Sequence, residues 1–470
     1  MKSKTAARAL PFLAFAACLC AAAVFMPGLY APDHREPSGA GSAAKPTFSV
    51  SEARAAEPDV WITIRQPFQR KLPLAVPAFL PDGGDQALEA STTGAELMRE
   101  TLGFTGFFKI ISPEAFIDDL GKGVTRNKVT FANWTAIGAE LLITGSVEQS
   151  GDTLVVELRF FDTLRGHLLV GKRYKGRADD LRRMVRRFAS EIVFVLTGTH
   201  GSFNTRISFV STTPGNKEIF ACDFDGHDPE QLTHNSDIAI SPAWSSDGEY
   251  IAYTAYKQGG AHMYVQNLAK KTGTVIKYKG LNITPAWHPR EFILAAALSM
   301  PGDTEIYSLT GNGKIIKRLT NNWGIDVSPS WSPDGKEIAF VSNRSGGPQI
   351  YILDVETGKA RRLTYRGRYN TSPSWSPRGD KIAYAGLEAG EFNIYIIDSQ
   401  GGAPVALTSD AGNNESPTWS PDGMMIAFSS TREGPSRIYV MTAIGTEQRR
   451  LLKLPGEQTE PAWSPRLSWY

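Results

Sequence analysis

The sequence is poor in cysteine and in long apolar runs, and both shortages limit what kind of protein it is. Its three cysteines are Cys18, Cys20 and Cys222. The first two fall in an apolar N-terminal stretch, so a disulfide framework is excluded and Cys222 is expected as a small strand residue. No later segment approaches ~18 consecutive apolar residues, so we expect no membrane-spanning helix.

An excess of one charge is also missing. The chain has 50 Lys and Arg against 48 Asp and Glu, which gives a formal net charge of +2. A basic footprint of the kind that binds nucleic acid or an anionic membrane surface is therefore not expected from bulk charge. We predict neither of these partners.

Catalytic signatures are the third shortage. The sequence contains no Gly-Xaa-Ser-Xaa-Gly elbow, no Walker loop, no Gly-Xaa-Gly-Xaa-Xaa-Gly and no His-Glu-Xaa-Xaa-His. Four histidines fall at inequivalent places in the repeat described below: His227, His234, His262 and His288. Inequivalent places do not build a ring of metal ligands, so we expect no cofactor, no catalytic metal and no enzyme activity.

The N-terminus has the pattern of a secretory leader. Lys2, Lys4 and Arg8 precede a short apolar core, which is typical of an export signal. We assign residues 1–31 to the signal peptide and 32–56 to a flexible linker or a further part of the leader. Cleavage near Ala31 and cleavage after Ala53-Arg-Ala-Ala56, just before Glu57, are both open.

A tryptophan motif of the form Ser-Pro-Xaa-Trp-Ser-Pro-Asp-Gly recurs through residues 199–470. Its tryptophans follow one another after 43, 44, 44, 44 and 44 residues: Trp244, Trp287, Trp331, Trp375, Trp419 and Trp463. Each period holds short β-branched and aromatic runs separated by Gly, Pro, Asn and Asp, which predicts four strands. A period of about 44 residues with four strands is typical of a β-propeller blade.

The two ends of the repeat predict how the ring closes. The strand that begins at Ile207 has no tryptophan motif before it, and Trp463 has no strand of that type after it. If the C-terminal strand completes the first blade, the ring has six blades and no open sheet edge. We expect the tryptophans to pack between blades and not to stack on a ligand.

Residues 57–198 predict a small α/β domain ahead of the propeller. We expect a helix over Ala87–Leu102 with Leu88, Leu97 and Leu102 on its apolar side, and a last helix from about Asp179 to Leu196. On the last helix four arginines cluster, and we favour a solvated helix face over a patch for an acidic partner. These arginines are Arg182, Arg183, Arg186 and Arg187.

The segment ahead of each Pro-Xaa-Trp enters the inner strand of its blade, so we expect it at the rim of the central channel. Its side chains differ between blades while the tryptophan motif does not, as an asymmetric protein partner requires. The other interpretation is that they are solvated turn residues. The predicted rim residues are Asp237, Leu281, Asn282, Thr284, Asp326, Asn370, Thr371, Asn414, Glu415 and Glu460.

Together these features resemble the TolB family. The repeat resembles its propeller, and Asp180–Ser211 resembles its junction between two domains. Pro461-Ala-Trp-Ser-Pro-Arg-Leu resembles its C-terminus. The resemblance covers about Glu57 to Leu467 and implies a multidomain chain, an N-terminal α/β domain followed by a six-bladed β-propeller.

The resemblance also implies a function. It predicts a non-enzymatic, monomeric scaffold of the Tol-Pal system in the periplasm, which supports the outer membrane and envelope constriction at cell division. The propeller face would bind the lipoprotein Pal. The mature N-terminal segment would bind the C-terminal domain of TolA, through Glu57, Asp59, Val60, Trp61, Ile62, Thr63 and Ile64. The alternatives are a polysaccharide lyase or a glycan-binding protein built on a related propeller.

Overall fold

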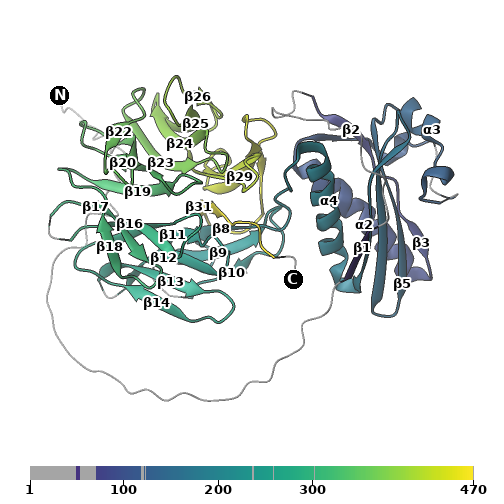
Figure 1. Ribbon diagram of the computed structural model, residues 1–470, viewed down its shortest axis with the longest axis horizontal. Helices are drawn as coiled ribbons and strands as arrows, with labels where there is room; N and C mark the ends of the chain where they lie inside the picture. Colours follow the sequence, from purple (N-terminus) through teal and green to yellow (C-terminus); the bar gives the residue numbers. More distant parts are fainter. Residues whose placement is uncertain are drawn as a thin grey trace, which may run out of the picture.

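The computed structural model describes residues 49–52, 70–117, 121, 123–234, 238–257, 259–300 and 302–468. They form two bodies side by side, an α/β domain and a ring of small sheets (Figure 1). Among the described residues, no helix is both long and apolar enough to cross a lipid bilayer.

The N-terminal domain is a seven-stranded mixed sheet with helices on both faces. The strand order is β1-β7-β6-β5-β2-β4, and β3 pairs with β5. The parallel pairs are β2 with β4 and with β5, and β3 with β5. The strands are β1 (Ser49–Glu52), β2 (Leu72–Ala75), β3 (Leu80–Asp82), β4 (Phe108–Ile110), β5 (Leu141–Ser150), β6 (Thr153–Asp162) and β7 (His167–Arg177).

Two long helices, α2 (Asp85–Phe104) and α4 (Leu181–Thr197), cover the face of this sheet toward the propeller (Figure 1). The helix α4 ends because Gly198 adopts a left-handed conformation, φ 73°. Short helical segments complete the domain: η1 (Pro113–Ala115), η2 (Arg126–Lys128), α3 (Phe131–Ala136) and η3 (Ala178–Asp180).

The packing of α2 corrects one expectation. Leu88 is 55% exposed, so it does not lie on the buried side of the helix. Small residues face the sheet instead, and Gly94 lets the ring of Phe79 approach so closely that an added Cβ would meet it at 3.1 Å. Leu102 is buried and Leu97 packs partly buried against the core, as expected, so only Leu88 was misassigned. A helix that packs through small residues carries a weak apolar pattern, which explains this error.

The strand β1 corrects a second expectation. Residues 32–56 were expected to be linker or leader, yet Ser49–Glu52 pair antiparallel with Lys172–Lys175 of β7. Four residues of that range therefore extend the sheet. The segment Glu57–Ile64 lies outside the described residues.

The C-terminal body is a six-bladed propeller, as the repeat predicted, with four antiparallel strands in each blade. Blade 1 holds β8 (Arg206–Ser211), β9 (Glu218–Asp223), β10 (Glu230–Gln231) and β31 (Gln458–Trp463); blade 2 holds β11 (Ile238–Trp244), β12 (Tyr250–Lys257), β13 (Gly260–Asn267) and β14 (Gly273–Ile276); blade 3 holds β15 (Asn282–Trp287), β16 (Ile293–Leu298), β17 (Glu305–Thr310) and β18 (Ile315–Arg318). Blade 4 holds β19 (Asp326–Trp331), β20 (Glu337–Ser342), β21 (Gln349–Asp354) and β22 (Ala360–Arg362); blade 5 holds β23 (Tyr369–Trp375), β24 (Lys381–Glu388), β25 (Glu391–Asp398) and β26 (Val405–Ala406); blade 6 holds β27 (Asn414–Trp419), β28 (Met425–Ser430), β29 (Arg437–Thr442) and β30 (Arg449–Arg450).

Ring closure follows the predicted scheme. The last strand, β31, pairs antiparallel with β8, the first strand of the propeller, with Trp463 opposite Ile207. The indole of Trp463 donates a hydrogen bond to Thr205 Oγ1 over 2.7 Å. The two ends of the propeller sequence thus complete a single blade.

The tryptophans lie between blades, as expected. Trp244 is 8% exposed, and its indole N–H donates to the carbonyl of Ala462 in the neighbouring blade over 3.1 Å. Trp331 and Trp419 make the same contact with their preceding blades. The repeated motif therefore joins blades and is not available to a ligand.

One hydrophobic core runs through both domains. A single cluster of buried side chains includes Met184 and Phe188 of α4, Phe203 and Phe224 of the propeller, and Leu452 near its end. Phe224 meets Phe104 of α2 edge to face, with ring centroids 5.3 Å apart. The two bodies are therefore held together by shared apolar burial and not only by a linker.

Candidate functional site

A cavity of about 430 Å³ opens where the six inner strands begin, and we call it the channel mouth. It is lined by Lys217, Ile240, Ser241, Leu281, Ile283, Thr284, Thr304, Ile325, Val327, Ser328, Tyr369, Thr371, Ser372, Phe392, Glu415, Ser416, Ser429, Thr459 and Glu460. Its size falls within the roughly 300–1,000 Å³ of pockets that bury small ligands. The channel narrows below it to a space of about 180 Å³ between the repeated Ser-Pro steps.

A repeated backbone distortion shapes the mouth. The residue three places before each tryptophan has a positive φ, between 49° and 55°, and a proline follows it. Each of these strands also carries an irregularity in its pairing at this step. A bulge turns the preceding side chain, four places before the tryptophan, toward the channel. The six distorted residues are Ser241, Thr284, Ser328, Ser372, Ser416 and Glu460.

The bulge residues of neighbouring blades are tied to one another. Glu460 Oε2 accepts hydrogen bonds from Ser241 N, over 2.7 Å, and from Ser241 Oγ, over 3.1 Å. Thr284 Oγ1 likewise accepts from Ser328 N over 3.2 Å. These contacts fix the left-handed residues, which are otherwise costly for side chains other than glycine.

The side chains four places before each tryptophan divide the mouth in two. Blades 2, 3 and 4 contribute Ile240, Ile283 and Val327, and the remaining three contribute Thr371, Glu415 and Thr459. At this position three consecutive blades are aliphatic and the other three are polar or acidic, although blade 5 also lines the mouth with Tyr369 and Phe392. A cavity with these two halves suits an amphipathic group of a partner better than a uniformly polar or apolar one.

Of the predicted rim residues, five line this mouth: Leu281, Thr284, Thr371, Glu415 and Glu460. Asp237 lies outside the described residues. The other four are corrected, because they are at most 2% exposed and lie behind the rim: Asn282, Asp326, Asn370 and Asn414.

These four side chains hold the loops that enter the inner strands. Asn282 accepts a hydrogen bond from Tyr278 N and donates to the carbonyls of Tyr278 and Gly280, over 2.8, 2.9 and 3.0 Å. Asp326 pairs with Arg344 over 2.6 Å. Gln458, at the same place in the sixth period, donates to the carbonyl of Pro455. The position five before the tryptophan is therefore structural.

Sequence reasoning missed two kinds of mouth residue. The aliphatic Ile240, Ile283 and Val327 were not named, although they occupy the same period position as Thr371 and Glu415, which were. On the same face, in the loops that lead into β19 and β23, Trp323 is 68% exposed and Tyr365 is 75% exposed. Large exposed aromatic side chains are typical of protein-binding surfaces.

The two acids of the mouth have no ion-pair partner among the described residues, although Lys217 also lines the cavity. Burial, and then the neighbouring carboxylate of Glu460, raise the pKa of Glu415. Within the part of the chain that the structure describes, no basic side chain forms an ion pair with Glu415 or Glu460. Glu460 instead has only the hydrogen bonds from Ser241 named above.

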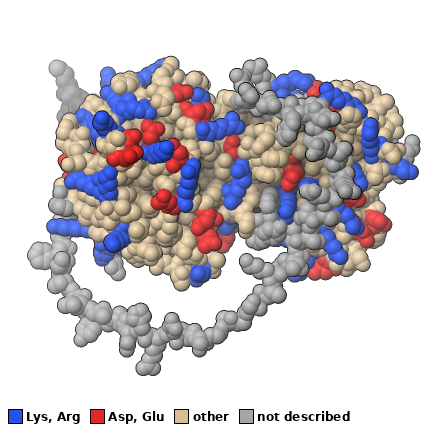
Figure 2. Space-filling view, viewed as in Figure 1, with Lys and Arg blue, Asp and Glu red and all other residues tan. Residues whose placement is uncertain are grey.

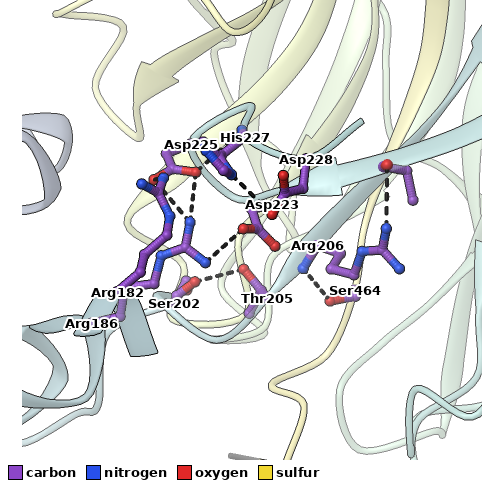
Figure 3. Close-up of polar contacts among 11 residues, drawn as sticks. Arg182, Arg186, Ser202, Thr205, Arg206, Asp223, Asp225, His227, Asp228 and Ser464 are labelled. Atoms are coloured by element: carbon purple, nitrogen blue, oxygen red, sulfur yellow. Dashed lines mark hydrogen bonds and ion pairs between the residues drawn. The ribbon is translucent and has the colours of Figure 1, made fainter. Parts of the chain in front are cut away.

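A second polar cluster lies at the opposite strand ends, where α4 meets blade 1, and we call it the junction cluster. Arg186 donates to Asp223 over 2.7 Å and to Asp225 over 2.9 Å, and Arg182 donates to Asp225 over 2.7 Å (Figure 3). The Arg186 side chain is only 11% exposed. The favoured interpretation of a solvated helix face is therefore wrong for these two arginines, which bind the propeller.

Next to this cluster, donor atoms of Asp223, His227 and Asp228 lie within 4.8 Å of one another, as metal ligands do. Asp223 is already paired with Arg186, and His227 Nδ1 lies 3.0 Å from Asp228 (Figure 3). We therefore assign these groups to the junction.

The rest of the surface is mixed in charge. On the face drawn in Figure 2, Lys and Arg lie interspersed with Asp and Glu over both bodies. This agrees with the formal net charge of +2. The mouth differs in that its two acids form no ion pair, although Lys217 also lines the cavity.

Comparisons with known proteins agree with this architecture. Residues 194–467 match the model of the TolB β-propeller domain, and residues 60–169 match that of the TolB amino-terminal domain. The Tol-Pal system protein TolB of Desulfosudis oleivorans is 53% identical over 266 residues, 56% of this chain and 61% of that one. The TolB homolog of Chlorobaculum tepidum is 42% identical over 271 residues, 58% of this chain and 61% of that one. These matches span about three-fifths of the curated relatives.

A solved structure matches more of the chain. The crystal structure of TolB from Acinetobacter baumannii superposes with a TM-score of 0.74 and 28% sequence identity, over 89% of this chain and all of that one. The similarity therefore includes both bodies and their arrangement.

Proposed function

Because the chain belongs to the TolB β-propeller family, we propose that it is a non-enzymatic scaffold of the Tol-Pal system in the periplasm. In this proposal the channel mouth and the loops around it dock the lipoprotein Pal. The segment Glu57–Ile64 docks the C-terminal domain of TolA. Through these contacts the protein supports outer-membrane integrity and constriction of the envelope at division.

One observation carries the proposal that the mouth face is the docking surface. It combines a concave, half-aliphatic mouth with exposed Trp323 and Tyr365, on a surface that is elsewhere mixed in charge. Aromatic anchors around a desolvated centre are what gives protein interfaces most of their binding energy. Rigid blades behind the loops keep this surface in place before a partner arrives.

Calorimetric titration of the full chain with the periplasmic domain of Pal from the same organism tests the proposal. We expect saturable one-to-one binding that Trp323→Ala weakens about tenfold, because an interface aromatic contributes more than about 1 kcal/mol. Leu164→Ala is the matched control, since Leu164 is 74% exposed but lies in the N-terminal domain.

Two results would count against this function. Absence of heat and of competition at tens of micromolar would reject Pal as the partner, and a glycan screen would then test the alternative. Equal losses in Trp323→Ala and Leu164→Ala would remove the mouth face as the docking surface. For the second half of the proposal, deletion of residues 57–64 is expected to abolish TolA binding and to spare Pal binding.

A further inference from the structure

Two acidic side chains occupy the polar half of the channel mouth on neighbouring blades. Glu415 enters from β27 of blade 6 and Glu460 from β31 of blade 1, and both line the same cavity of about 430 Å³. Glu460 is held in place by Ser241, whose N and Oγ both donate to Oε2. The position of at least one carboxylate is therefore set by the fold and not by solvent.

This arrangement costs free energy in the isolated chain. Burial and the neighbouring Glu460 raise the pKa of Glu415, because both disfavour its charged form. Elsewhere on the same face the chain pairs its buried acid, since Asp326 accepts from Arg344 over 2.6 Å. An unpaired pair of acids inside a cavity is therefore a local exception that an external positive charge would relieve.

The opposite half of the mouth is aliphatic. Ile240, Ile283 and Val327 take the same period position in three consecutive blades, across the cavity from Thr371, Glu415 and Thr459. A group that fits both halves carries a positive head and an apolar stem. Among protein side chains, Lys and Arg have this form, because their methylene stems pack on apolar surface while the head stays polar.

We propose that the mouth receives a Lys or Arg side chain of the docking protein, with its charged head between Glu415 and Glu460 and its stem against Ile240, Ile283 and Val327. This deepens the proposed function and rests on it for the identity of the docking protein. The inserted side chain sets the register of the partner on the ring, since the two acids that line the mouth come only from the neighbouring blades 6 and 1.

A probe that needs no partner tests the mouth itself. Butylammonium, an analogue of the lysine side chain, is titrated into the full chain in a chelator-containing buffer while the methyl signals of Ile240, Ile283 and Val327 are followed by NMR. We expect saturable shifts in the millimolar range, and at least tenfold weaker binding of butanol, which has the same stem and no charge. In a Glu415→Gln, Glu460→Gln double variant the two ligands should bind alike.

The control variant is Glu391→Gln, which removes one exposed carboxylate from the same face outside the mouth. It should leave the preference for butylammonium unchanged. If butylammonium and butanol bind the natural chain equally, or if the double variant keeps the preference, the inference is overturned.

A second titration separates this inference from the proposed function. The periplasmic domain of Pal should bind the Glu415→Gln, Glu460→Gln variant at least tenfold more weakly than the natural chain, and with a smaller salt dependence. If Pal binds both proteins equally, the basic side chain is rejected and the proposed function stands. If Pal binds neither but butylammonium behaves as expected, the proposed function falls and the cation-accepting mouth remains.

Discussion

The acidic side chains at the two ends of the propeller differ in whether they form ion pairs. At the junction cluster Asp223 and Asp225 are paired with Arg186 and Arg182 from another domain. At the mouth Glu415 and Glu460 share a cavity without a basic partner among the described residues. The ion pairs of the junction cluster hold the two domains together. The mouth carries unpaired negative charge that a basic group of a partner can neutralise.

The largest expected effect is a loss of stability when the ion pairs of the junction cluster are removed. Arg186→Ala leaves Asp223 and Asp225 partly buried without their main counter-charge, and removing one member of a buried pair costs about 3 kcal/mol. Denaturant unfolding should show this loss. Alkylation of Cys222, a buried thiol whose pKa is raised foremost by burial, should become faster, because that residue lies in the shared core next to Asp223.

The control for this pair is Arg183→Ala. Arg183 pairs with Asp180 on its own helix over 2.7 Å and is 30% exposed, so the expected cost is about 0.5 kcal/mol. Equal losses in the two variants would show that the junction cluster does not hold the domains together.

The next effect tests whether Asn282, which lies behind the rim of the mouth, stabilises the fold or contacts a partner. Asn282→Ala leaves Tyr278 N and three carbonyls without their buried partner, which costs about 2 kcal/mol. Thermal unfolding checks this, with the exposed amide of Asn321 as control, where alanine should change stability by about 0.5 kcal/mol or less. A stable Asn282→Ala protein that no longer binds Pal would restore Asn282 as a contact residue.

The smallest expected effect concerns the unpaired acids of the mouth, and here the substitution should raise the stability of the protein. The folded-state pKa of Glu415 is raised, so its protonated form is favoured and the stability it contributes is lost as pH rises through that pKa. Glu415→Gln should therefore be more stable than the natural chain at pH 7.5, by about 0.5 kcal/mol, and equally stable at pH 4. Melting curves at the two pH values measure this. Destabilisation at pH 7.5 would mean that Glu415 is structural.

The fold was predictable because its signals are local and repeated. Each period carries its own strands and its own Ser-Pro-Asp-Gly turn, and the unmatched ends at Ile207 and Trp463 predicted the closure that β8 and β31 make. The glycine of this turn has a positive φ, 77° at Gly335, which its missing side chain permits. Such information does not depend on distant parts of the chain.

The sites were harder because they depend on contacts distant in sequence. Arg186 was interpreted as part of a solvated helix face, because its partners Asp223 and Asp225 lie in another domain and are distant in sequence. Asn282 and Asn414 were predicted at the rim of the channel as partner-binding residues, but the loop folds over them and they satisfy its backbone. The apolar half of the mouth was hidden because an isoleucine in a strand is expected in the core.

The closing strand also has a consequence for how the protein is made. Gln458–Trp463 must pair with Ile207–Ser211 across nearly the whole propeller sequence, so the ring cannot close before residues 458–463 are available. Trp463, Leu451 and Leu452 belong to the same core cluster as Met184 and Phe188 of the N-terminal domain. The N-terminal domain is therefore packed in part by residues at and just before the closing strand, so one step of folding both closes the ring and completes the contact between the two domains.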